Sequence, residues 1–136
     1  MNLIQSYDAS KKKVDYVTSL TLKMGLYKSA HTPAASDTFA TYTAIEADFS
    51  GYARQNTSGW GAAAIVAGRA VSTGTQLNFT HSGGGVNNTV YGAFLFYTVA
   101  GTDYLYGAGE DPSPFVMNAA GLTYAVVPQV TDKSEY

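Results

Sequence analysis

The chain has 136 residues, the length of one domain with a sizeable core. No apolar run approaches the roughly 18 to 20 residues of a membrane helix, so we expect no membrane partner. The chain has no cysteine, which excludes disulfides, thiolate metal sites and thiol nucleophiles. With 8 basic and 10 acidic residues it has no strong positive field, so we expect no nucleic-acid partner.

Charged residues make up only 13% of the chain, about half of the usual share, whereas there are 11 tyrosines. Interfaces between proteins are enriched in tyrosine and depleted in lysine and glutamate. The composition therefore favours a chain whose surface is partly covered by other protein. The alternative is a small β-domain that carries tyrosines on its strands.

Residues 1–16 differ from the rest, because they include three consecutive lysines and show no strand alternation. We interpret them as an extended N-terminal arm before a β-sandwich domain over residues 17–136. Adjacent ammonium groups could hold an acidic neighbour, and a solvated tail is the alternative. The expected partner-binding residues are the apolar, aromatic and lysine side chains of this arm: Leu3, Ile4, Tyr7, Lys11, Lys12, Lys13 and Tyr16.

The first strand is predicted from Leu20, Leu22, Met24 and Leu26, which alternate with other residues as a strand with one buried face requires. Further alternation and turn residues extend the prediction along the chain. We expect extended segments over residues 39–44, 77–81, 90–99, 104–108 and 122–130. We expect turns or loops at 48–52, 83–88, 100–103, 112–114 and 118–121.

Residues 90–99 (VYGAFLFYTV) form the strongest predicted strand, and their aromatic residues on both faces place it at the centre of a sheet. Many short strands with frequent turns indicate an all-β antiparallel β-sandwich. A jelly roll is the arrangement we favour. The alternative is an immunoglobulin-like sandwich, although the paired cysteines of many such domains are absent.

Candidates for catalysis or metal binding are few. His31 and His81 lie far apart in the sequence without a metal-ligand spacing, so we interpret them as surface or turn residues. The pair Glu46 and Asp48 could share one face of a strand and hold Ca²⁺, but a polar strand end is the commoner arrangement. Trp60 could stack on a sugar or pack in the core. We therefore expect no enzyme activity, no cofactor and no essential metal.

The stretch LYKSAHTPAASDTFATYTAIEADFSGYARQ over residues 26–55 resembles small proteins encoded in the structural-gene regions of tailed bacteriophages. The block of residues 46–54 is its most distinctive part. The resemblance resumes at residues 114–117 and at 120–130, and it is loose between these segments.

This resemblance implies a non-enzymatic virion structural protein. The expected role is capsid decoration, as a cement protein that binds the major capsid protein and stabilises the assembled phage head. The resemblance also implies a homotrimer on the capsid exterior, made in the host bacterial cytoplasm. A head fibre or tail component is the alternative within this class, and a carbohydrate-binding adhesin module is the alternative outside it.

Overall fold

The computed structural model describes residues 1 and 3–132. Strands make up 42% and helices 14% of the structure, and the sheets are antiparallel, which confirms the all-β class. In chain order the elements are α1 (Tyr7–Ser19), β1 (Lys23–Tyr27), α2 (Phe39–Thr43), β2 (Gln55–Asn56), β3 (Ala64–Val66), β4 (Arg69–Thr73), β5 (Leu77–Thr80), β6 (Asn88–Val99), β7 (Thr102–Met117), β8 (Thr123–Val126) and β9 (Gln129–Thr131).

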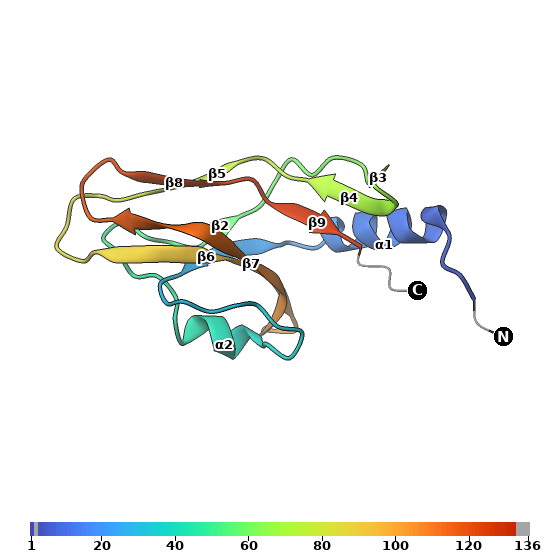
Figure 1. Cartoon of the computed structure of the whole chain (residues 1–136), viewed down its shortest axis with the longest axis horizontal. Helices are drawn as coiled ribbons and strands as arrows, with labels where there is room; N and C mark the ends of the chain where they lie inside the picture. The colour runs from blue at the N-terminus through green and yellow to red at the C-terminus, as the bar shows by residue number, and fades with distance from the viewer. Residues whose placement is uncertain (2, 133–136) are drawn as a thin grey trace.

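The strands form two layers. The larger layer is a four-stranded sheet in the order β2-β1-β6-β7. The other layer consists of two short sheets, β3-β4-β9 and β5-β8. Figure 1 shows the short sheets on one side of the large sheet and α2 on the other. The main core lies between the layers, where residues such as Met24, Leu95, Phe79 and Val130 are buried in one cluster.

The predicted central strand is confirmed. β6 pairs with β1 on one side and with β7 on the other. Its alternate residues are buried in different clusters: Leu95 packs in the main core, whereas Phe94 and Phe96 pack in a second cluster with Tyr27 and Tyr42. A strand covered on both faces needs apolar residues at consecutive positions, which explains the unbroken apolar run. The predicted hairpin after β6 is also present.

Residues 112–114 were expected to form a turn, but they lie within β7. The register between β6 and β7 changes there, from Gly92 opposite Glu110 to Val90 opposite Phe115. Residues 111–114 therefore stand opposite Tyr91 alone. A bulge at a sheet edge accommodates prolines, because the missing N–H groups are not needed for pairing.

Residues 39–44 were expected to be extended, but Phe39–Thr43 form the short helix α2. The Thr41 hydroxyl accepts a hydrogen bond from the Thr38 N–H at 3.0 Å, which ties the first turn of the helix together. The helical spacing of Phe39 and Tyr42 turns both rings toward Phe94. The alternating pattern of this segment favours a strand, but packing against the large sheet makes it a helix.

The expectation of an extended N-terminal arm is wrong for most of its length. Residues 7–19 form the helix α1, which packs against β4, β3 and β9. The Ser6 side chain accepts a hydrogen bond from the Ala9 N–H and caps the helix. Ser10 and Val14 are buried four residues apart, as one face of a helix requires. The boundary expected between residues 16 and 17 falls within this helix.

Candidate partner-binding site

The predicted partner-binding residues lie on the N-terminal segment, which we define as residues 1–6, and on α1. Leu3 and Ile4 are each 84% exposed, and Tyr7 and Tyr16 are also exposed. Residues 3–6 lead into the start of α1 from outside the two layers (Figure 1). Large apolar side chains in this position have no cover from the rest of the described chain. They are therefore available to a partner.

The three lysines do not form one binding group. Successive residues of a helix point in different directions, so Lys11, Lys12 and Lys13 are spread around α1. Lys11 lies 3.8 Å from Asp8, and the Lys13 ammonium donates a hydrogen bond to the Gln5 side-chain oxygen. Lys12 makes no ion pair with the residues that the structure describes. The lysines thus give the helix a general positive charge.

The N-terminal segment is fixed at its base. The Asp132 carboxylate accepts hydrogen bonds of 2.6 Å from the Ser10 hydroxyl and from the Gln5 amide. The bond from Ser10, followed by that from Gln5, holds the pKa of Asp132 below its usual value. Asp132 follows β9 directly. Gln5 is therefore fixed beside β9, with Leu3 and Ile4 beyond this anchor.

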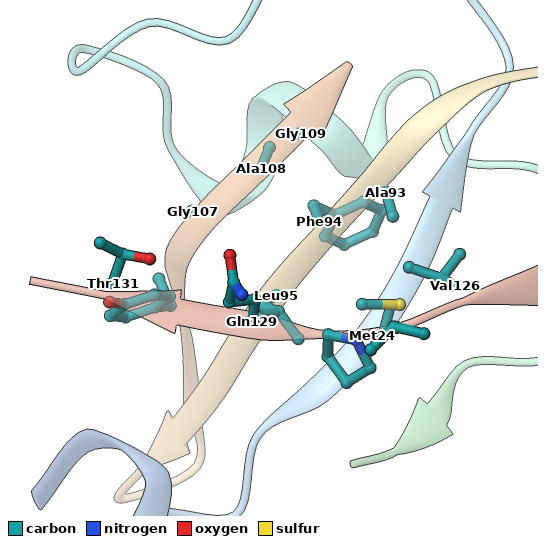
Figure 2. A pocket seen from close by; sticks show the side chains of 13 residues that line it. Met24, Ala93, Phe94, Leu95, Gly107, Ala108, Gly109, Val126, Gln129 and Thr131 are labelled. Carbon is teal, nitrogen blue, oxygen red and sulfur yellow. The ribbon is translucent and has the colours of Figure 1, made fainter. Parts of the chain in front are cut away.

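A second surface, which the sequence did not reveal, is a groove between the two layers. Its volume is about 390 Å³. Figure 2 shows Met24, Leu95 and Val126 around it, together with Gln129 and Thr131 near one end. Residues of β1, β6 and β7 line one side, and residues from β8 to β9 line the other: Met24, Ala93, Phe94, Leu95, Tyr106, Gly107, Ala108, Gly109, Val126, Val127, Pro128, Gln129 and Thr131.

Small residues create this groove. Gly107 stands opposite Leu95, and Gly109 stands opposite Ala93, in the register of β6 and β7. Residues opposite each other in an antiparallel pair share one face of the sheet, and Leu95 and Ala93 face the main core. A Cβ added at either glycine would meet no atom within 4 Å. The space above the sheet at these two glycines is therefore not filled by any side chain.

The groove lies beside free strand edges. β7 is the last strand of the large sheet, and β8 and β9 are each at the edge of a short sheet. β8 is tied to β7 where the Tyr124 hydroxyl donates a 2.7 Å hydrogen bond to Asp111 and the Tyr124 ring contacts Phe115. Burial, and then the bond to Asp111, raise the pKa of Tyr124. The lining is uncharged, but Glu110 follows Gly109 on β7.

The acidic pair considered for calcium has other partners. Arg54 donates two hydrogen bonds to Glu46, at 2.7 and 2.8 Å, and Tyr52 donates a third. Asp48 lies 2.9 Å from the Lys28 ammonium, which together with Asn88 lowers the pKa of Asp48. Within the described residues, no three potential ligands gather as a metal site would require. Both carboxylates are therefore engaged in contacts with other side chains of the chain.

The two histidines have different surroundings. His31 lies 2.8 Å from Asp37 in the loop before α2. His81 was expected at the surface or in a turn, but it follows β5 and is only 2% exposed. Its Nδ1 accepts a hydrogen bond from the Gly83 N–H, so its Nε2 is the donor to the Val86 carbonyl and to Asn87. His81 thus organises the glycine-rich loop.

Trp60 is partly buried and packs against the main core. Its indole N–H donates a 3.0 Å hydrogen bond to the Thr57 hydroxyl. One face lies against Gly74, where an added Cβ would be 3.3 Å from the ring. A platform for sugars needs an open ring face. Trp60 therefore contributes to the core through one covered face of its ring.

Comparisons with protein families, with curated proteins and with solved structures give no match for this chain. In the described residues, neither helix has the length and apolar character needed to cross a membrane. The candidate site thus consists of two separate features, an exposed apolar N-terminal segment and an empty groove between the layers. The groove has a sequence signal, glycines at two alternate positions of one strand, but only the register shows which face they leave open.

Proposed function

We propose that this chain is a non-enzymatic virion structural protein, a capsid decoration protein that binds the major capsid protein and stabilises the assembled phage head. The proposal includes its assembly as a homotrimer on the capsid exterior. It also includes a jelly-roll arrangement of the β-sandwich. The resemblance of residues 26–55 and 114–130 to small phage structural proteins is its starting point.

The observation that carries the proposal is the exposed N-terminal segment on a rigid body. Leu3 and Ile4 are almost fully exposed, while the base of their segment is fixed to Asp132. Burying two such side chains in a partner would contribute roughly 1.5 to 3 kcal/mol each. A segment anchored at one end loses less conformational freedom on binding than a free tail. It can therefore serve as an attachment element.

Decoration requires that the protein prefers the assembled shell to its free subunits. A ligand that binds only the assembled state stabilises that state by mass action. The antiparallel sandwich supplies a stiff body that spans neighbouring subunits, and the N-terminal segment supplies reach. No chemical step is needed for this role.

The test is co-sedimentation of the chain with undecorated shells. The variant removes only residues 1–6, because α1 contributes the buried Val14 to the core. We expect the truncated chain to fold, as judged by circular dichroism, and to lose at least tenfold in shell affinity. Full occupancy by the truncated chain would move the attachment surface elsewhere.

Point variants separate apolar contact from charge. Leu3→Ser with Ile4→Ser should weaken shell binding about as much as the truncation. Val99→Ser is the matched control, since Val99 is also exposed but belongs to the end of β6 and not to the N-terminal segment. Replacing Lys11, Lys12 and Lys13 with alanine should have a smaller, salt-sensitive effect, because exposed ion pairs contribute about 0 to 1 kcal/mol each.

A further inference from the structure

We infer that the groove between β7 and the β8–β9 segment receives the N-terminal segment of a second copy of this chain. The inference deepens the proposed function, on which it rests, by naming where copies join. Each copy would insert Leu3 and Ile4 into the next copy, so the loss of shell affinity expected on truncation of residues 1–6 would follow from loss of the ring. The two surfaces are different, so the contact is head-to-tail and can close into a ring such as a trimer.

Apolar character matches on the two sides. The N-terminal segment presents Leu3 and Ile4 without cover, and the groove is lined by Met24, Leu95 and Val126, of which Met24 and Leu95 are only 3% and 7% exposed. Ile4 and Leu3 are the first and second residues beyond Gln5, so at about 3.3 Å per extended residue they extend roughly 3 to 7 Å from the anchor at Asp132. The neighbouring groove must therefore lie close to this anchor if Gln5 keeps its bond.

The backbone of the groove also suits an extended segment. β7 has a strand partner on one side only, because it ends the four-stranded sheet. A peptide in strand conformation can pair with such an edge and place alternate side chains in a pocket beside it. Gly107 and Gly109 leave room for those side chains.

Charge is complementary as well. No charged residue lines the groove, but Glu110 continues β7 from Gly109. Asp132, at the β9 end, is bound by Ser10 and Gln5 of its own chain. α1, which follows the inserting segment, carries three lysines, Lys11 to Lys13, and two acidic residues, Asp8 and Asp15. A copy that inserts its first residues therefore brings three lysines near Glu110. The same charges would oppose a contact between two grooves or between two helices.

The absence of native cysteines allows a direct test. One chain carries Ile4→Cys, and a second, tagged chain carries Gly107→Cys. After mixing and mild oxidation, we expect a disulfide between the two chains, because disulfides form only where the Cα atoms come within about 7 Å. The control replaces the second chain with Gly85→Cys, a loop position where a Cβ also meets nothing. The Gly107 partner should give at least tenfold more product.

Three outcomes would overturn the inference. Equal cross-linking to both partners would show that contact is random. Dominant pairing of two Gly107→Cys chains would show that β7 edges pair with each other. In a chain that carries both cysteines, a bond formed only within the chain would show that the segment folds into its own groove.

Filling the groove gives an independent readout. Gly107→Val should leave the chain folded but reduce its mass in light scattering to that of one copy, 14.4 kDa. Gly85→Val should leave the mass of the assembly unchanged. A wild-type chain that is a monomer yet co-sediments with shells would contradict this inference and the proposed homotrimer, and it would leave shell decoration standing. A ring that never binds shells would contradict the proposed function alone.

Discussion

The two faces of the β6–β7 strand pair are built in opposite ways. One face carries Phe94, Phe96 and Leu105 and is covered by α2. The Phe39 ring of α2 lies 4.8 Å from Phe96, and the Tyr42 ring stacks on Phe94 at 5.3 Å. We call this the closed face. The other face, the open face, carries Ala93, Leu95 and two glycines of β7 and borders the groove.

Polar groups also seal the closed face. Arg54 lies 5.2 Å from the Phe39 ring and 5.1 Å from the Phe96 ring, and it makes two hydrogen bonds to Glu46. These bonds raise the pKa of Arg54. The open face has no such cover over its glycines. The contrast teaches that this chain fills one face of the β6–β7 pair with aromatic rings and leaves a groove over the two glycines of the other.

The largest expected effect comes from emptying the closed face. Phe94→Ala should lower the free energy of unfolding by about 3 to 5 kcal/mol, because a buried ring is lost and a cavity remains. Urea denaturation followed by circular dichroism measures this effect. The matched change on the open face, Gly107→Ala, should lie within about 1 kcal/mol of wild type. Similar losses for both variants would contradict the distinction between the faces.

Substitutions of two glycines, Gly92 and Gly109, also test the difference between the two faces. A Cβ at Gly92 would lie 2.2 Å from the Gly109 carbonyl oxygen, whereas a Cβ at Gly109 would meet nothing within 4 Å. Gly92→Ala should therefore cost about 1 to 3 kcal/mol through overpacking. Gly109→Ala should be neutral or stabilise by about 0.4 to 1 kcal/mol, since it restricts the unfolded chain. Thermal melts of both variants check the prediction, and a destabilised Gly109→Ala would show that the open face is already filled.

The smallest effect concerns the anchor of the N-terminal segment. The pKa of Asp132 is lowered in the folded state, so its contribution to stability is present above the usual value near 4 and is lost as the pH falls through the folded-state value. Asp132→Asn should cost about 0.5 to 1.5 kcal/mol at pH 7. The difference between wild type and variant should begin to shrink below about pH 4 and disappear once the pH is below the folded-state pKa of Asp132, and urea denaturation at several pH values measures it. A difference independent of pH would contradict the role of the charge.

Much of the large sheet could be predicted from the sequence. The apolar run at 90–99 predicts a strand covered on both faces, and the structure confirms β6 as central. The corner at 48–52 is also confirmed, with Gly51 at a positive φ of 89°. The residue types within each segment are enough to predict these two features.

The helices could not be predicted in the same way. Residues 39–43 (FATYT) alternate like a strand, yet the spacing of Phe39 and Tyr42 also fits a helix, and contact with Phe94 decides between them. For α1, only Ser10 and Val14 are buried, and two residues at helical spacing are too few to predict a helix from the sequence. The exposed residues Leu3 and Ile4 were identified from the sequence as candidates, whereas the groove depends on the register of β6 and β7 and on a second layer far away in the sequence.

The thermal stability of the viral shell tests the central claim most directly. Undecorated shells are heated with and without a saturating amount of the full chain, and their disruption is followed by calorimetry and electron microscopy. Binding to the assembled state must raise the disruption temperature, by an amount that grows with the concentration of free protein. The account predicts this shift for wild type and its loss for the chain without residues 1–6. An unchanged disruption temperature with the protein bound would contradict a role in stabilising the shell.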